Sequence, residues 1–420
     1  MIDAGRFYRR WAGVIVCCLG LAWMGWPSLV WCAAGIDFPQ GGKDAVVISL
    51  PDGAIAFSAN ADTALVPASI LKLLTALVAI DTLGTGYRFP TDFSTTEDGR
   101  LLVKGYGDPL FISEAIDVAA MQLVKLLPSG RRPCLSGISL DKSYFVEPLL
   151  IPGVNDTDNP YDAPNGALCA NFNTVFFTRN PLNGRLETAE PQTPLLPFAE
   201  ERIGRYAEVT DRVVLSHHEN DATRYAGHLL RFFLESHGCN VSGNVDIVPK
   251  TPPPPADFAW RFSSPYTVTM IIQRMMTYSN NFMANQLLIA SAAAAYGPPG
   301  NLAQGARLAR AFADKNLGLK RLVLVEGSGI SRDNRISAAD MHRVLGAFYR
   351  YRHLLRKDGD DAFKTGTLDG IRTRAGYFTV DGKDYGYVVM LNSDTRRMDA
   401  VMQAVRRHIR GLAATAAGRP

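Results

Sequence analysis

The chain has few of the residue patterns that build metal, redox or nucleic-acid sites. Its six cysteines form no CxxC pair and its seven histidines form no HExxH or comparable set, so we expect no metal ion and no cofactor. The formal net charge is only +4, of which the charged residues before position 11 contribute +2, so nothing indicates a nucleic-acid partner. By contrast, 47% of the residues are apolar and 20% are charged, as in a globular protein with a large core. A length of 420 residues is enough for two or three domains.

A long apolar run near the N-terminus indicates export from the cytoplasm. Three arginines within the first ten residues precede this run (11–31), and small residues follow it. The order is typical of a secretory signal peptide, here 1–34 with cleavage after Ala34. The run is longer than a usual signal core, so an uncleaved membrane anchor is the alternative. In both cases we expect the remaining chain to act in the periplasm.

Three of the cysteines, Cys134, Cys169 and Cys239, lie after the signal peptide. An odd number in an oxidising compartment allows one disulfide and one free thiol. Three buried thiols fit the sequence equally well, so the sequence leaves the pairing open.

Strand patterns near both ends of the exported chain predict a single sheet. The expected strands are 45–50, 53–57, 363–368, 374–380 and 385–391. Helical patterns lie between the two groups, and one of them opens with Ser264 and Pro265 as an N-cap and first-turn pair. We therefore expect an α+β fold in which helices cover an antiparallel sheet.

The stretch 88–255 has a different sequence pattern, with short strand-like segments, many prolines and one expected helix at about 221–236. It ends in a stiff proline-rich linker at 250–255. Since it is far longer than an ordinary connection, we expect it to be a large, mostly β insertion. The predicted organisation is a signal peptide (1–34), the first part of the sheet-and-helix domain (35–87), the insertion (88–255) and the second part of that domain (256–420).

A buried helix at about 67–83 carries the first candidate site residues. Ser69 and Lys72 are three residues apart, which places hydroxyl and amine on one face near the helix N-terminus. A buried lysine is costly unless its pKa falls, and a neutral amine beside a serine is a base beside a nucleophile. The alternative is a helix start whose lysine reaches out to water. Ser139 and Lys142 repeat the same spacing by chance.

Two further clusters follow in the chain. Ser279 and Asn281 lie between two expected helices, and Lys364 begins the sequence Lys-Thr-Gly-Thr on an expected strand. Separately, each has an ordinary explanation, because helix-to-helix turns favour Ser and Asn and a strand edge favours Lys. SxN also occurs at 58–60 and 242–244. The specificity lies in the set of SxxK, SxN and KTG in this order.

This set is the signature of class A β-lactamases and penicillin-binding proteins. More narrowly, the chain resembles the class C low-molecular-mass penicillin-binding proteins, the S13 family of D-alanyl-D-alanine carboxypeptidases/endopeptidases. Further similarity lies at 105–109 (GYGDP), at 160–164 (PYDAP) and at 326–332 (EGSGISR). S13 proteins carry extra domains between the first two motifs, where β-lactamases have no room for them. Departures from the family pattern are Asn280 for Asp, Glu326 for Asp, Tyr106 for Gly and a somewhat short insertion.

The resemblance implies a β-lactamase/transpeptidase-like fold and a residue-by-residue assignment of roles. It makes Ser69 the nucleophile, Lys72 its base, Ser279 a proton relay and Asn281 an orienting group. Lys364, with Thr365, Gly366 and Thr367, would bind the terminal carboxylate of the substrate. The implied oxyanion hole consists of the backbone N–H groups of Ser69 and Thr367.

The implied substrates are peptidoglycan stem peptides, with β-lactam antibiotics as covalent inhibitors. A membrane contact is expected only if the N-terminal segment stays uncleaved. Two alternatives stay open: a serine β-lactamase, for which no obvious extra carboxylate motif is present, and a catalytically silent protein that binds cell-wall peptides. The sequence separates neither carboxypeptidase from endopeptidase nor one oligomeric state from another.

Overall fold

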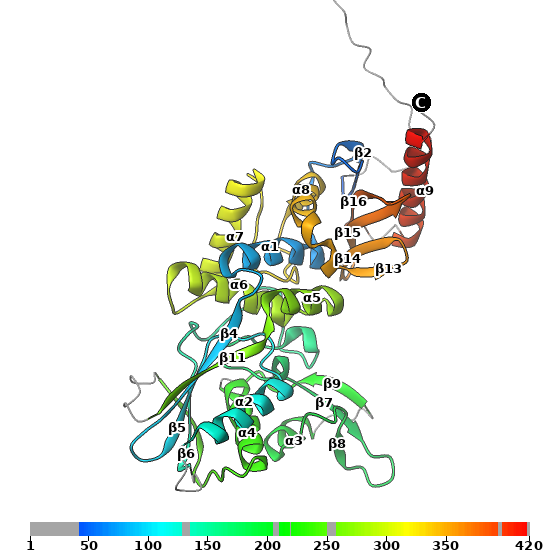
Figure 1. Cartoon of the computed structure of the whole chain (residues 1–420). Helices are drawn as coiled ribbons and strands as arrows, with labels where there is room; N and C mark the ends of the chain where they lie inside the picture. Colours follow the sequence, from blue (N-terminus) through cyan, green and yellow to red (C-terminus); the bar gives the residue numbers. More distant parts are fainter. Residues whose placement is uncertain are drawn as a thin grey trace, which may run out of the picture. The chain divides into compact units, whose positions relative to one another are not determined.

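The computed structural model describes residues 42–127, 135–204, 210–218, 220–249, 258–393 and 397–417 (Figure 1). The expected signal peptide (1–34), Cys134 and the proline-rich linker (250–255) lie outside these residues. Among the helices in the described ranges, none is both long enough and apolar enough to cross a membrane.

Strands from both ends of the described chain form one six-stranded antiparallel sheet (Figure 1). Its strands, in spatial order, are β13 (Arg356–Asp358), β14 (Asp361–Leu368), β15 (Ile371–Val380), β16 (Lys383–Leu391), β1 (Asp44–Ser49) and β2 (Ile55–Ala59). The two ends meet where β1 pairs with β16, with Val47 opposite Val388. This sheet confirms the predicted α+β fold and adds the short edge strand β13.

Helices cover both faces of this sheet. Helix α8 (Ala338–Phe348) packs on β1, β15 and β16, whereas α9 (Met398–Ala417) packs on β15 and β16. Figure 1 shows the sheet between these two helices. Every residue of β1 is buried, which explains why residues 45–48 are all apolar rather than alternating with polar residues.

Helix α1 (Lys72–Leu83) is the central helix of the core. Its neighbours are α5 (Val268–Tyr278), α6 (Asn281–Tyr296), α7 (Leu302–Leu317) and α8. Because helices surround it, residues 72–79 are all buried, as its apolar sequence predicts. The 3₁₀ turn η1 (Ala68–Leu71) precedes it, and Gly84 ends it with a positive φ of 87°.

The start of α5 differs from the expectation. Ser264 and Pro265 lie in strand β11 (Ala259–Thr267), and Thr267 is the actual N-cap of α5, with its Oγ1 accepting a hydrogen bond from Met270 N at 3.3 Å. Strand β11 is held extended because it pairs with β4 (Arg88–Thr95). A local Ser-Pro helix signal is thus overridden by strand pairing that is distant in sequence.

The described residues form three further sheets, two of which are formed mainly by the middle of the chain. A five-stranded sheet has the order β10 (Val245–Val248), β6 (Gly137–Asp141), β5 (Arg100–Gly105), β4 and β11. A three-stranded sheet consists of β8 (Leu186–Thr188), β7 (Thr174–Arg179) and β9 (Thr210–Val214), and β3 (Ala64–Leu65) pairs with β12 (Ile336–Ser337). Strand β11 follows the expected end of the insertion, so the five-stranded sheet extends past residue 255.

This part of the chain is more helical than the sequence analysis expected. Helix α4 (Asp221–Ser236) has the predicted bounds, but α2 (Ser113–Leu126) and α3 (Pro197–Ile203) were not predicted. The buried face of α2 consists mostly of small residues, and no side chain caps its N-terminus. Its sequence therefore shows little contrast between an apolar and a polar face and lacks the cap by which a helix start is recognised.

The stretch 88–255 also packs into the core around α1. Five of its buried residues belong to the same apolar cluster as α1 and α6: Phe89, Leu110, Phe145, Ile151 and Ala167. Asn165 ties its loop to α6, because Asn165 Nδ2 donates hydrogen bonds to Phe282 O and Gln286 Oε1, both at 2.9 Å. This places the loop around residues 160–167 beside the first turn of α6.

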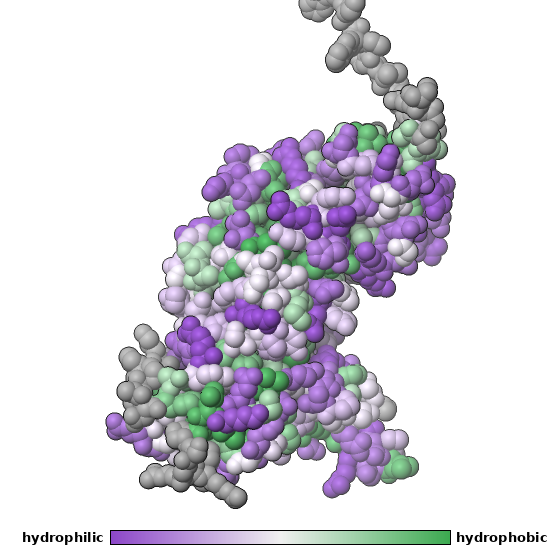
Figure 2. Space-filling model, in the orientation of Figure 1, coloured by the Kyte–Doolittle hydropathy of each residue, from purple (hydrophilic) through white to green (hydrophobic). Residues whose placement is uncertain are grey.

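The described cysteines lie in the interior. Cys169 is a buried free thiol, and burial raises its pKa to about 12. Cys239 is buried in the second apolar core, with α2 and α4. On the face shown in Figure 2, hydrophilic residues cover much of the surface and hydrophobic residues form scattered patches.

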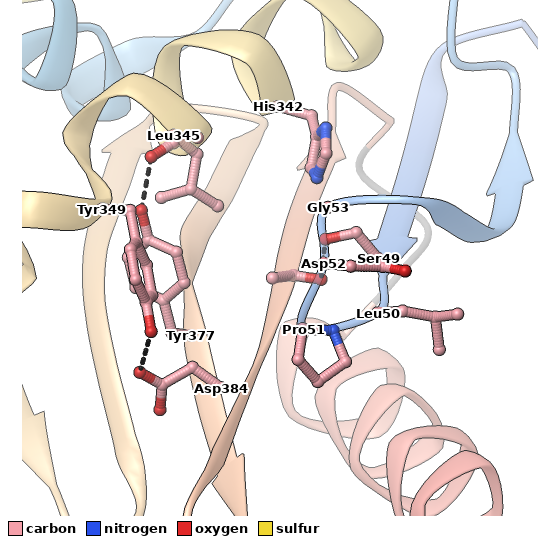
Figure 3. Close-up of a pocket in the computed structure, with 12 residues that line it drawn as sticks. Ser49, Leu50, Pro51, Asp52, Gly53, His342, Leu345, Tyr349, Tyr377 and Asp384 are labelled. Carbon is pink, nitrogen blue, oxygen red and sulfur yellow. Dashed lines mark hydrogen bonds between the residues drawn. The ribbon is translucent and has the colours of Figure 1, made fainter. Parts of the chain in front are cut away.

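A cavity of about 250 Å³ lies between the β1–β2 turn, helix α8 and strands β15 and β16 (Figure 3). Two of the lining side chains are hydrogen-bonded to other lining residues. Tyr349 donates a hydrogen bond to Asp384 at 3.1 Å, and Tyr377 donates one to the carbonyl of Leu345. None of its lining residues belongs to the SxxK, SxN or KTG motif. The cavity is therefore separate from the candidate active site.

Candidate active site

Ser69 and Lys72 form the centre of the candidate site. Ser69 lies in η1 and is partly exposed, whereas Lys72 is the first residue of α1 and has no exposed surface. Lys72 Nζ lies 2.9 Å from Ser69 Oγ. It also donates hydrogen bonds to Asn281 Oδ1 at 2.8 Å and to Ser328 O at 2.7 Å. The amine is thus held in contact with the hydroxyl by groups from two other segments.

The surroundings of Lys72 favour the neutral amine. Burial lowers the pKa of Lys72 well below its ordinary value, and the positive charge of Lys364 lowers it further. The carboxylate of Glu326 acts in the opposite direction, with a smaller effect. A neutral Lys72 can accept the proton of the Ser69 hydroxyl, which is the arrangement of a base and an activated nucleophile.

Ser279 and Lys364 form a second hydroxyl–amine pair. Ser279 follows the last residue of α5 in a left-handed conformation, with φ of 54°, and Asn280 caps α6. Lys364 Nζ donates hydrogen bonds to Ser279 Oγ and to Thr365 O, both at 2.7 Å. Burial lowers the pKa of Lys364 to about 7. Its charge therefore changes near neutral pH.

Strand β14 lies directly beside the Ser69 backbone. A Cβ atom at Gly366 would lie 2.6 Å from Ser69 N and 2.3 Å from Thr373 Oγ1, so only glycine permits this approach. Thr373 Oγ1 donates a hydrogen bond to Pro67 O at 2.7 Å, which further ties the neighbouring strand to the loop before Ser69. Thr365 and Thr367 are exposed on either side of Gly366, where a ligand could reach them.

Comparisons with known proteins identify the family of this chain. The sequence matches the model of the D-Ala-D-Ala carboxypeptidase 3 (S13) family over residues 36–200 and 203–357. The chain belongs to the S13 family. The resemblance inferred from the three motifs is thereby confirmed.

Relatives of this S13 chain are known by sequence and by structure. A D-alanyl-D-alanine carboxypeptidase of Actinomadura sp. (strain R39) is 25% identical over 358 residues, 72% of this chain and 63% of that enzyme. The chain thus matches somewhat less than two thirds of that relative's length. Penicillin binding protein 4 (dacB) from Haemophilus influenzae has a TM-score of 0.70 at 20% identity, over 89% of this chain and 97% of that one. The Bd0816 predatory endopeptidase from Bdellovibrio bacteriovorus has a TM-score of 0.53 at 18% identity, over 90% and 94%. Both structures show a shared fold.

All the site residues predicted from sequence lie close together in this S13 protein. Ser69, Lys72 and Asn281 share one hydrogen-bond cluster, Ser279 and Lys364 form another, and Gly366 packs on Ser69. Since Asn281 follows Ser279 by two residues, the two clusters adjoin. The other Ser-Lys pair with this spacing is not such a site, because Ser139 accepts a hydrogen bond from Arg100 and Lys142 pairs with Glu147.

Two contacts at the site were not assigned from the sequence. The carbonyl of Ser328 is an acceptor for Lys72, and the carbonyl of Tyr161 accepts a 3.4 Å hydrogen bond from Asn281 Nδ2. Both residues lie in segments noted only for their S13-like sequences. The signal was present as a motif, but backbone carbonyls have no side-chain signature, so their roles could not be inferred. Among the described residues, no group of three or more His, Cys, Asp or Glu could hold a metal ion.

Proposed function

We propose that this S13 protein is a serine D-alanyl-D-alanine peptidase that cleaves peptidoglycan stem peptides through an acyl-enzyme on Ser69. The observation that carries the proposal is the buried Lys72 amine, 2.9 Å from Ser69 Oγ and with a strongly lowered pKa. A buried neutral base in contact with a partly exposed serine is the arrangement needed for acyl transfer. Family membership supports the same reaction class.

The proposed reaction begins with proton transfer from the Ser69 hydroxyl to Lys72. Ser69 Oγ then attacks the carbonyl of the penultimate D-alanine, and the backbone N–H groups of Ser69 and Thr367 stabilise the resulting oxyanion. When the C–N bond breaks, Ser279 passes the proton to the leaving amine, while Asn281 orients Lys72 and the substrate amide. Water then attacks the ester, releases the acid and restores the Ser69 hydroxyl.

We propose that Lys364 binds the terminal carboxylate of the substrate, with Thr365, Gly366 and Thr367 along the same strand. Two observations support this role. Lys364 already donates to a hydroxyl at the site, and both threonines are exposed beside it. Lys72 must be neutral to act as a base, so Lys364 is the cation of the three motifs that remains to supply the charge for the carboxylate.

Amidation of the terminal carboxylate is expected to lower kcat/KM by roughly one to two orders of magnitude. A charge-assisted hydrogen bond contributes roughly 1.5–3 kcal/mol, and 1.36 kcal/mol corresponds to about tenfold in rate. Steady-state kinetics on a D-Ala-D-Ala peptide and its amide measure the effect. Lys364→Ala should lose at least as much on the acid substrate, and amidation should then matter far less. Equal amidation penalties in both proteins would mean that the carboxylate is bound elsewhere.

The same contact predicts how discrimination depends on pH. Lys364 is charged below its pKa of about 7 and neutral above it. The ratio of kcat/KM for the acid to that for the amide should therefore be largest below pH 7 and fall as the pH rises through this value. A ratio that is constant from pH 5 to pH 9 would contradict the assignment.

The test of the proposed function is incubation with isolated muropeptides, both monomeric and cross-linked, followed by mass analysis. Loss of one D-alanine from monomers indicates carboxypeptidase activity, and conversion of dimers to monomers indicates endopeptidase activity. Rapid turnover of penicillin without peptide cleavage would favour a β-lactamase. A protein that neither cleaves the peptides nor is labelled by penicillin would be a silent binder, contrary to the proposal.

We further propose that the protein acts in the periplasm on the cell wall, with β-lactams as covalent inhibitors. The expected signal peptide (1–34) supports export. The Haemophilus influenzae protein has also been solved in complex with a β-lactam, and that structure has a TM-score of 0.63 at 17% identity over 88% of this chain and 96% of that one. We infer neither a nucleic-acid partner nor a membrane contact beyond an uncleaved N-terminal segment.

We also retain the division of the chain at 35–87, 88–255 and 256–420 as a proposal. It is supported by the six-stranded sheet, whose strands come only from the first and last of these parts. Strand β11, at the start of the third part, pairs with β4 at the start of the second, so these two parts share the five-stranded sheet.

A further inference from the structure

We propose that Glu326 is a positioning residue for Lys72 and acts through the peptide bond between Ser328 and Gly329. This inference rests on the proposed function, because it concerns how the base of that reaction is held. Glu326 does not contact the reacting atoms, and the sequence motif gave it no role.

Glu326 is a fully buried carboxylate with an unusually complete set of donors. Its Oε2 accepts hydrogen bonds from Ser328 N at 2.7 Å and from Ser328 Oγ at 2.6 Å. Its Oε1 accepts from Gly329 N and Asn334 Nδ2, both at 2.7 Å, and from Ser331 N at 3.3 Å. All five donors are neutral groups. They offset the cost of burying the carboxylate without cancelling its charge with a cation.

One peptide unit connects this carboxylate to the base. The N–H of Gly329 donates to Glu326 Oε1 at 2.7 Å, and the C=O of the same peptide, which belongs to Ser328, accepts from Lys72 Nζ at 2.7 Å. Hydrogen bonds at the two ends of a peptide unit polarise one another in a low-dielectric interior. The carboxylate therefore fixes the direction of the Ser328 carbonyl and strengthens it as an acceptor.

The same peptide also packs against the nucleophile. Gly329 has a positive φ of 83°, and a Cβ atom there would lie 1.9 Å from Ala68 O. Ala68 itself has a positive φ of 47°, which is strained for a non-glycine residue and persists only where the surroundings enforce it. A rotation of the Ser328–Gly329 peptide would thus disturb both Lys72 and the residue before Ser69.

Charge gives a second link between Glu326 and Lys72. The groups that face the Lys72 amine are the neutral Ser69, Asn281 and Ser328 carbonyl, while two charges act on it from nearby. Lys364 on β14 lowers the pKa of Lys72, and Glu326 raises it. Removing the charge of Glu326 should therefore lower the pKa of Lys72 still further.

The test is the pH dependence of penicillin acylation in Glu326→Gln. The amide nitrogen of glutamine would face donors, so the variant loses hydrogen bonds as well as the charge. We expect the acylation rate at its plateau to fall roughly 10- to 100-fold, as for other small displacements of a catalytic group. The acidic limb, which reports the Lys72 pKa, should move to lower pH, because the negative charge that raises this pKa is removed. A limb at the wild-type position would overturn the proposal even if the rate falls, because a merely structural role lowers the rate without moving the limb.

Asp361→Asn is the matched control, since it removes another buried carboxylate, at the first residue of β14, which is bonded to Arg374, Arg406 and Tyr387. Its acidic limb should stay at the wild-type pH. If Glu326→Gln does not fold, Asn334→Ala tests the same link in the opposite direction. It removes one donor from Glu326 Oε1, so less of the carboxylate's negative charge is offset locally and the pKa of Lys72 should rise. The limb should then move to higher pH, and an unmoved limb contradicts the proposal. Wild-type protein that is not acylated at any pH would instead refute the proposed function.

Discussion

Ser69→Ala is expected to abolish covalent labelling by penicillin. The acyl-enzyme forms through Ser69 Oγ, so its removal leaves no atom for the bond, and loss of a serine nucleophile typically costs on the order of 10⁶ in kcat. Little stability should be lost, because Ser69 is partly exposed and its hydroxyl contacts Lys72 at 2.9 Å. Intact-protein mass after incubation with penicillin, with peptide mapping of the adduct, measures the result.

Ser139→Ala is the matched control for this variant, because Ser139 repeats the spacing to a lysine. Ser139 lies in β6 with its hydroxyl bonded to Arg100 Nε at 2.9 Å, so it should contribute nothing to acylation. Full labelling is expected in Ser139→Ala. Labelling that persists in Ser69→Ala, or an adduct that maps to Ser139, would refute the assignment of the nucleophile.

Lys72→Met is expected to slow penicillin acylation by roughly 10²–10⁴-fold, the usual contribution of a general base. Methionine has a similar length and fills the buried space, but it cannot accept the Ser69 proton. The acceptors Asn281 Oδ1 and Ser328 O lose their donor, so some stability should also be lost, about 1–3 kcal/mol for each acceptor left buried and unpaired. Stopped-flow acylation measures the rate, and thermal unfolding measures the stability.

The pH profile separates loss of the base from loss of packing. In the wild type the acylation rate should rise with pH as Lys72 becomes neutral, with a midpoint well below the ordinary lysine pKa because burial and Lys364 lower it. The residual rate of Lys72→Met should lack this rise. A variant that is less than tenfold slower and keeps the wild-type profile would mean that another group takes the proton.

Local patterns predicted several elements of the fold well. The apolar stretch at 45–50 predicted a strand, and the apolar positions within about 67–83 predicted a buried helix; the structure has β1 and α1 there. Helix α4 was found with its observed bounds, because its apolar residues recur with helical period on one face. In each case the buried residues follow the apolar pattern within the segment, so the sequence alone predicts the strand or helix.

Predictions were wrong or incomplete where packing with distant segments decides the structure. Ser264 and Pro265 have the residue types of a helix start, yet they lie in β11 between Ser263 and Thr267, which both pair with β4. Helix α2 was missed because its buried face is built mostly from small residues that give little contrast between faces. Both elements depend on contacts with segments that are distant in the sequence, and a short stretch of sequence does not include those segments.

The order of three short motifs determined the family and the reaction class, because each motif supplies a chemical group in a fixed local geometry. The SxxK spacing by itself does not separate Ser69 from Ser139, since both have a lysine three residues later, and only the resemblance to the family assigned Ser69. The tertiary structure separates them: it buries Lys72 beside Ser69, whereas Lys142 pairs with Glu147 at 2.9 Å. The lowered pKa of Lys72 and the acceptor at Ser328 likewise exist only in the fold. The physical reason is that desolvation and long-range hydrogen bonds depend on which segments meet in space, and chain order does not specify this.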